Sequence, residues 1–239
     1  CIYVNITKDI NITSSNAWSE NSKSLFIING NHHTIKVSNP SDCGENHFLT
    51  VGENGKVVIR NLTLSRFNSA IVNHGNVELE RVIFNSNRKN YRLEQTDVGG
   101  AVWNRGVLNC INCSFIKNYA KLGGAIFSNS SGSIVNLIHC YFSDNEAYAD
   151  SNGWRSFCSG FWNHITKVND FLNRNKRECY VCSGDDVFVG CGGTVYAYSL
   201  NPPRLLHGSD EFFCTPKNKI IFGYDDSNLG HTIVLRDSY

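Results

Sequence analysis

The chain has 239 residues, of which 41% are hydrophobic, so it can bury a large core in one domain or one elongated body. Its 22 Lys and Arg residues are almost matched by 21 Asp and Glu residues, and this formal net charge of +1 argues against electrostatic binding of nucleic acid or of an anionic membrane. No apolar run is long enough to span a bilayer. The chain contains no Met, so we expect a processed mature chain or a fragment.

The first predicted coil has the sequence FIINGNHHTIKV, at residues 26–37. An apolar strand, an Asn-Gly turn and a second strand follow one another, which is similar to stretches near the N-terminus of β-helix proteins. The paired His32 and His33 could indicate a metal site. Because neighbouring strand positions face opposite sides, we instead expect the two rings to diverge and to belong to a turn, with no metal or cofactor bound.

Four segments with one shared pattern follow this coil. Three of them align on a Phe residue, at residues 70–87, 101–118 and 125–145, and a more divergent copy lies at 55–68. Apolar residues alternate within each segment, and the pattern recurs at intervals of 20–31 residues. The matched positions are Val57/Val77/Leu108/Val135, Ile59/Leu79/Cys110/Leu137, Leu62/Val82/Cys113/Cys140 and Leu64/Phe84/Phe115/Phe142.

Strands too short to be stable alone, repeated along the chain, predict a parallel β-helix in which each coil covers the side chains of the next. Matched residues would then lie about 4.8 Å apart along the axis. Small residues that permit tight corners are Gly99, Gly100, Ala101, Gly123, Gly124 and Ala125. The segments end on Asn87, Asn118 and Asn145. We expect these asparagines to adopt left-handed turns and to bond one another from coil to coil.

The repeated Gly-Gly-Ala-Ile/Val followed by Phe-x-x-Asn is clear in residues 99–145 and partial in residues 55–87. It resembles the repeat of the chlamydial polymorphic outer membrane proteins, which also occurs in adhesin-like proteins of microbes and some large viruses. The resemblance implies a right-handed parallel β-helix displayed on a surface. This chain differs from the family in its many cysteines, which favours a eukaryotic or virus-encoded secreted product over a bacterial outer membrane.

The pattern lapses between residues 152 and 177, where we predict an irregular insertion with a short helix. The residues at helical spacing are Ile165, Val168, Phe171 and Leu172. Strands are expected again at 187–198, and two last strands, KIIFGY at 219–224 and HTIVLRD at 231–237, would close the open end of the solenoid.

We therefore expect a single β-helix domain over residues 1–239. Its parts are an N-terminal cap with the first coils at 1–54, regular coils at 55–150, and irregular Cys-rich coils with a C-terminal cap at 151–239.

Ten cysteines predict a disulfide framework formed in an oxidising compartment. They are Cys1, Cys43, Cys110, Cys113, Cys140, Cys158, Cys179, Cys182, Cys191 and Cys214. Two Cys-x-x-Cys pairs have zinc-ribbon spacing, but the first of them falls inside the repeat, where its sulfurs should be packed or bonded. Cys113 and Cys140 share a column on adjacent coils and would either form a bridge or pack together. Cys1–Cys43 and pairs among the later cysteines would join the ends, in a connectivity that the sequence leaves open.

Five Asn-x-Ser/Thr acceptor sites occur beside these cysteines, at Asn5, Asn11, Asn61, Asn112 and Asn129. Together the two features favour a secreted, glycosylated chain found outside the cell, at a cell surface or on a virion surface.

An enzymatic alternative arises at residues 183–193, SGDDVFVGCGG. This stretch resembles the Gly-Asp-Asp strand of polygalacturonases, in which paired carboxylates act as general acid and base at a glycosidic bond. The resemblance implies that Asp170, Asp185, Asp186 and His207 form the catalytic group. The chain departs from the family at Val168-Asn169-Asp170 and Leu206-His207-Gly208, and no Arg-Ile-Lys follows. We therefore favour no catalytic residue.

The favoured function is a non-enzymatic surface scaffold or adhesion module. Trp154, Phe161 and Trp162 would form a contact patch for a glycan or a protein, or else cover one side of the solenoid. Assembly with further copies of the chain is an equally open expectation, and neither nucleic acid nor insertion into a membrane is expected.

Overall fold

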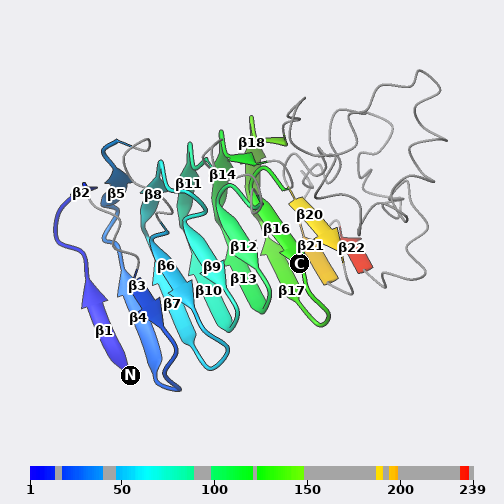
Figure 1. Cartoon of the computed structure of the whole chain (residues 1–239), viewed down its shortest axis with the longest axis horizontal. Coiled ribbons are helices and arrows are strands. Elements are labelled where there is room, and N and C mark those ends of the chain that lie inside the picture. Colours follow the sequence, from blue (N-terminus) through cyan, green and yellow to red (C-terminus); the bar gives the residue numbers. More distant parts are fainter. Residues whose placement is uncertain are drawn as a thin grey trace, which may run out of the picture.

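The computed structural model describes residues 1–13, 18–39, 47–88, 98–120, 123–147, 187–190, 194–198 and 232–236. These residues form an all-β parallel solenoid, in which three parallel sheets surround one hydrophobic core (Figure 1). The helix expected at residues 165–172 lies outside this part of the chain. Among the described residues, no helix has the length and apolar character needed to cross a membrane.

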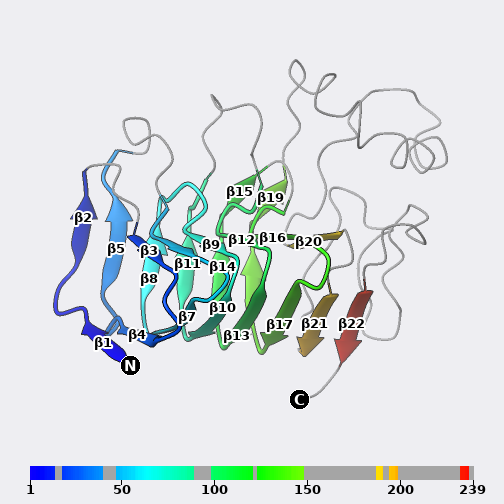
Figure 2. The same ribbon diagram turned by 60° about the horizontal axis from the view of Figure 1, so that its bottom comes forward.

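Each of the first six coils contributes one strand to each sheet in turn, from sheet A to sheet B to sheet C (Figure 2). Sheet A contains β1 (Ile2–Asn5), β4 (Leu25–Asn29), β7 (Lys56–Arg60), β10 (Asn76–Glu80), β13 (Val107–Ile111), β17 (Ile134–Ile138), β21 (Thr194–Tyr198) and β22 (Thr232–Arg236). Sheet B contains β2 (Ile10–Ile12), β5 (Thr34–Val37), β8 (Thr63–Ser65), β11 (Ile83–Asn85), β14 (Ser114–Ile116) and β18 (Tyr141–Ser143). Sheet C contains β3 (Trp18–Glu20), β6 (Leu49–Val51), β9 (Ile71–Asn73), β12 (Val102–Asn104), β16 (Ile126–Asn129) and β20 (Val187–Gly190). A small fourth sheet pairs β15 (Tyr119–Ala120) with β19 (Glu146–Ala147).

The register confirms the columns that the repeat predicts. Val77 pairs with Val57 and Leu108, and Phe84 pairs with Leu64 and Phe115. The strands expected at 26–37, at 187–198 and near the C-terminus are present as β4, β5, β20, β21 and β22. The KIIFGY strand expected at 219–224 lies outside the described residues. The sequence therefore predicts the order of the strands and also which residues stack on which.

Three phenylalanines form a continuous file inside the solenoid. The ring centroids of Phe84 and Phe115 lie 5.0 Å apart, and those of Phe115 and Phe142 lie 4.8 Å apart, with the rings nearly parallel. This spacing matches the separation of neighbouring strands. The rings of successive coils are thus stacked on one another in the core.

The predicted asparagine ladder is present, but its backbone geometry differs from the prediction. Asn87 Nδ2 donates to Asn118 Oδ1 at 3.0 Å, and Asn118 Nδ2 donates to Asn145 Oδ1 at 2.9 Å. All three side chains are buried. The left-handed residue is instead the one before each asparagine, at Ser86, Lys117 and Asp144. That residue turns the chain at the corner, so the following asparagine can point into the core.

The Gly-Gly corners are confirmed. Gly99 and Gly123 have φ values of 60° and 62°, in the left-handed region that glycine adopts without strain. A Cβ atom on Gly100 would lie 2.2 Å from the carbonyl oxygen of Gly124 on the next coil. Ala101 and Ala125, which follow the corners, are fully buried.

The cysteines of the regular coils are free thiols, in contrast to the expected disulfide framework. Cys110, Cys113 and Cys140 are buried together in the core, and Cys1 is exposed. A disulfide bridge and packing side by side were both open for Cys113 and Cys140. In the structure the two side chains pack in the core as free thiols. Burial raises the pKa of the Cys110 thiol well above its ordinary value, and the Cys113 side chain together with burial does the same for the pKa of Cys140. The other six cysteines lie outside the described residues.

Candidate functional site: a polar groove between sheets C and A

The residues that the sequence suggested for function lie outside the part of the chain that the structure describes. They are Trp154, Phe161, Trp162, Asp170, Asp185, Asp186 and His207. Within the described ranges, no group of three or more His, Cys, Asp or Glu side chains is arranged to hold a metal ion. His33 Nδ1 lies 3.2 Å from Asp9 Oδ1, and His32 has a left-handed φ of 65°, which fits the turn expected for this pair.

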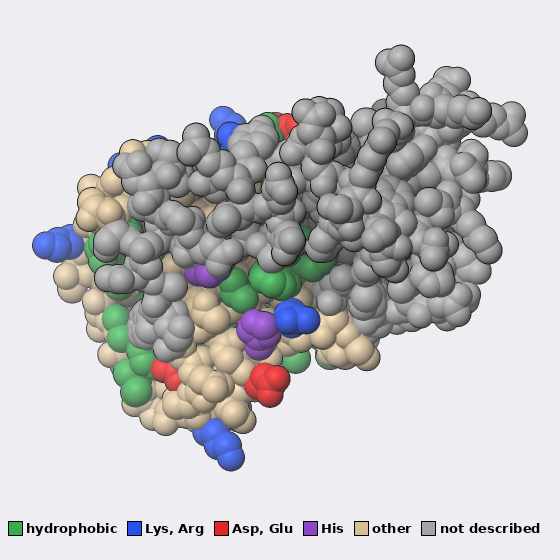
Figure 3. Space-filling view, in the orientation of Figure 1, with side chains coloured by type: hydrophobic (Ala, Val, Ile, Leu, Met, Phe, Trp, Pro, Cys, Tyr) green, Lys and Arg blue, Asp and Glu red, His purple; other side chains and the backbone are tan. Residues whose placement is uncertain are grey.

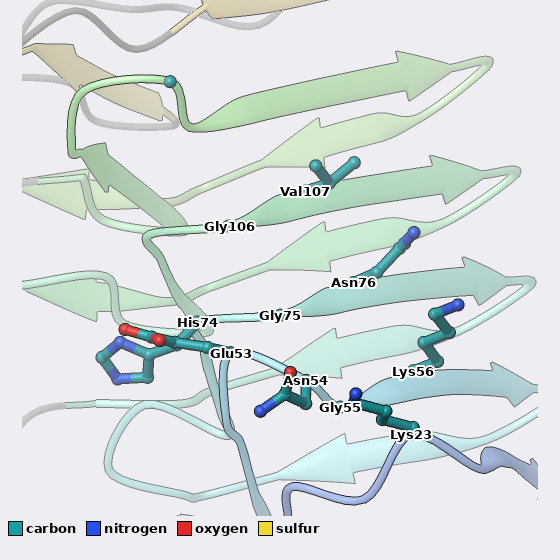
Figure 4. Close-up of a pocket in the computed structure, with 11 residues that line it drawn as sticks. Lys23, Glu53, Asn54, Gly55, Lys56, His74, Gly75, Asn76, Gly106 and Val107 are labelled. Carbon is teal, nitrogen blue, oxygen red and sulfur yellow. The ribbon is translucent and has the colours of Figure 1, made fainter.

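The structure instead contains a polar groove that sequence reasoning missed. The groove encloses about 490 Å³ and follows the corner at which sheet C passes into sheet A, across several coils (Figure 4). The polar side chains that line it are Lys23, Glu53, Asn54, Lys56, His74 and Asn76. They come from three separate stretches of turn and strand start, at residues 23, 53–56 and 74–76.

A file of glycines forms the floor of the groove. Gly55, Gly75 and Gly106 occupy matched positions immediately before β7, β10 and β13. A Cβ atom on Gly106 would lie 2.1 Å from the carbonyl oxygen of Gly75, and one on Gly75 would lie 2.5 Å from that of Gly55. The close approach of successive backbones therefore requires glycine here, and it leaves the floor without side chains.

A second buried ladder supports this floor from inside the core. Asn73 Nδ2 donates to Asn104 Oδ1 at 2.8 Å, and Asn104 Nδ2 donates to Ser128 Oγ at 3.1 Å. The same asparagines accept hydrogen bonds from the backbone N–H groups of Gly75 and Gly106. The sequence signal for this ladder is a repeated Asn-x-Gly, as Asn73-His74-Gly75 and Asn104-Arg105-Gly106. The backbone of the groove is thus held by hydrogen bonds to two fully buried asparagines.

Two lysines of the groove differ from the charged residues near them, because they have no ion-pair partner among the described residues. At the far end of β7, the Arg60 guanidinium pairs with Glu80 at 3.1 Å, and Glu80 also pairs with Arg81 at 2.6 Å. At the groove end of the same strand, Lys56 forms no ion pair or side-chain hydrogen bond with any described residue, and the same holds for Lys23. Their ammonium groups are therefore available to an external anion.

His74 directly precedes Gly75 of the groove floor, and its ring lies beside the Glu53 carboxylate (Figure 4). Burial lowers the pKa of the imidazole below its ordinary value, and the nearby Arg105 guanidinium lowers this pKa further. Glu53 acts in the opposite direction. The ring is thus neutral at pH 7, where it can donate one hydrogen bond and accept another.

We predict that NMR titration of the native chain will give His74 a pKa below 6.5, its ordinary value. Arg105→Ala should raise this pKa because a positive charge is removed, and Glu53→Gln should lower it because a negative charge is removed. The neutral ring is favoured by folding, so protonation of His74 as the pH falls below 6.5 works against the folded state. A native pKa at or above the ordinary value would contradict this description of the groove.

Three of the five glycosylation candidates are exposed to solvent. Asn5, Asn11 and Asn112 are exposed, and Asn61 is half-buried. Asn61 and Asn112 have φ values of 51° and 53° and share the corner column between sheets A and B, away from the groove corner. Asn129 belongs to β16, and its side chain is not among the described ones.

The fold and the groove together define the protein as a parallel β-solenoid with three sheets and an open polar groove along one corner. No protein-family model, curated protein or solved structure matches the chain. Its function must therefore be argued from the molecule itself.

Proposed function

We propose that this chain is a non-enzymatic extracellular glycoprotein that acts as a surface adhesion module or scaffold, at a cell surface or on a virion. In this proposal the solenoid is a right-handed parallel β-helix of the kind found in the chlamydial polymorphic outer membrane proteins and similar adhesins. Disulfides among the later cysteines would cross-link its C-terminal part, and glycans would be attached to the accessible acceptor asparagines. The partner is a glycan or a protein, or another copy of the chain.

One observation carries the adhesion proposal: polar side chains, including two lysines with no ion-pair partner among the described residues, line a groove whose backbone is held by buried asparagine ladders. A preorganised site loses little conformational entropy when it binds a partner. The charged side chains on the described part of the face in Figure 3 are few and separated by neutral surface, in keeping with a net charge of +1. Selective contacts in a groove therefore suit this chain better than broad electrostatic attraction.

The polysaccharide-cleaving alternative needs two carboxyl groups on either side of one glycosidic bond. Among the described lining residues of the groove, Glu53 is the single carboxylate. The groove by itself thus supports binding rather than acid–base cleavage. The alternative depends on Asp170, Asp185, Asp186 and His207, which lie outside the described residues.

We predict that the full chain, secreted from a eukaryotic host, will bind immobilised glycans or cell surfaces without releasing reducing ends from polysaccharides. A mass decrease after enzymatic removal of N-glycans should accompany this result, because accessible acceptor sites are present. Asp186→Asn serves as the control for catalysis. Release of reducing ends that disappears in this variant would replace the adhesion proposal with the hydrolase.

A further inference from the structure

We propose that the groove binds an anionic oligosaccharide lying along the solenoid axis, with the ammonium groups of Lys23 and Lys56 contacting its carboxylate or sulfate groups. This inference rests on the proposed adhesion function and gives that function a ligand class.

The dimensions of the floor fit an extended sugar chain. Gly55, Gly75 and Gly106 lie in register on three successive coils. The floor therefore advances by about 4.8 Å with each coil, close to the length of one sugar unit in an extended polysaccharide. Gly75 and Gly106 are half-buried and carry no side chain, so a sugar ring can approach their backbone directly.

The charge of the groove selects an anion. Lys23 and Lys56 supply two ammonium groups against the single carboxylate of Glu53, and neither lysine has an ion-pair partner among the described residues. A carboxylate or sulfate placed between them would form charge-assisted hydrogen bonds without breaking any existing ion pair. The side-chain amides of Asn54 and Asn76 offer donors and acceptors for sugar hydroxyl groups.

The backbone of the groove argues against a peptide ligand. The N–H of Asn76 donates to Gly55 O at 2.9 Å, and the N–H of Val107 donates to Gly75 O at 2.8 Å. The N–H groups of Gly75 and Gly106 bond to the asparagine ladder beneath. Among the described residues of this corner, no strand edge is therefore open for β-strand addition, the mode by which an extended peptide gains main-chain hydrogen bonds. Recognition must come from side chains, which suits hydroxyl and acidic groups on a sugar.

The experiment is calorimetric titration of the full chain with four probes of similar length. They are oligogalacturonate, a sulfated heparin-derived oligosaccharide, a neutral malto-oligosaccharide and oligoglutamate. We expect at least one acidic saccharide to bind, with an affinity that falls as salt is added, and the neutral saccharide to bind at least about tenfold more weakly.

The variants locate that binding in the groove. Lys23→Ala combined with Lys56→Ala should lower the affinity for the acidic saccharide by at least about tenfold, because charged hydrogen bonds are lost. Lys36→Ala is the matched control, since Lys36 is an exposed lysine on β5 in sheet B. Both lysines of the groove are exposed, so thermal unfolding of the double variant should match that of the native chain. Lys56→Glu, which reverses the charge, should abolish binding while preserving the fold.

Three results would overturn the inference and leave the adhesion proposal standing. These are equal binding of the neutral saccharide, preferred binding of oligoglutamate, and an acidic saccharide that binds the double variant as well as the native chain. Cleavage of any saccharide probe would overturn the adhesion proposal itself.

Discussion

Phe115→Ala should lower the free energy of unfolding by about 4 kcal/mol, because it opens a cavity in the centre of the aromatic file. Phe115 is fully buried and stacks on Phe84 and Phe142 at centroid distances of 5.0 and 4.8 Å. Its loss therefore removes two ring contacts in addition to the transfer energy of the ring. Denaturant unfolding followed by circular dichroism measures the change.

The control for this variant lies on the same strand. Ile116→Ala alters the next residue of β14, which faces outward and is half-buried, so we expect a loss of at most about 1 kcal/mol. Phe115→Leu should fall between the two because it preserves most of the apolar volume. If Phe115→Ala and Ile116→Ala cost the same, the file of rings would contribute no more than ordinary surface packing.

The regular coils could be predicted from sequence because their determinants are local and repeated. Alternating apolar residues set which face of each strand is buried, and the aligned Phe residues set the register between coils. Phe84, Phe115 and Phe142 therefore fell into one file, as their spacing in the sequence requires. The ladder of Asn87, Asn118 and Asn145 followed from the same alignment.

The left-handed positions were assigned to the wrong residues because propensity alone points to asparagine. Ser86, Lys117 and Asp144 adopt this conformation instead, so that the following asparagines can be buried and bonded. Tertiary hydrogen bonds outweigh the cost of a left-handed residue, about 1–2 kcal/mol at each position.

The groove could not be predicted because no single segment contains it. Lys23, Glu53 and His74 meet only after successive coils stack, and each looks like an ordinary turn residue in isolation. The glycines of the floor are visible in the sequence, yet their function as a floor depends on the carbonyl groups of the preceding coil. For Cys110, Cys113 and Cys140 the disulfide expectation had a different weakness. The number of cysteines indicates the compartment of the protein, whereas a buried column position also suits a small apolar thiol.

Asn118→Ala should lower the free energy of unfolding by about 3 kcal/mol, although it removes no large apolar group. The Asn118 side chain donates to Phe84 O and Asn145 Oδ1, and its Oδ1 accepts hydrogen bonds from the N–H and Nδ2 of Asn87. All of these groups are sealed from water, so the broken bonds cannot be replaced by solvent. Asn118→Asp should cost at least as much, because a carboxylate cannot donate to the two oxygens that face it.

Asn109→Ala provides the comparison that separates the ladder from asparagine in general. Asn109 lies on β13, one strand before Asn118 in the same coil, and its Oδ1 accepts a hydrogen bond from Asn136 on the outer, half-buried face of sheet A. Water can replace that bond, so we expect Asn109→Ala to cost less than about 1 kcal/mol by urea unfolding. Equal losses for the two variants would mean that burial adds nothing to the ladder. A larger loss at Asn118 would show that the buried amides hold successive coils in one register, and the groove requires that register if its floor is to remain continuous.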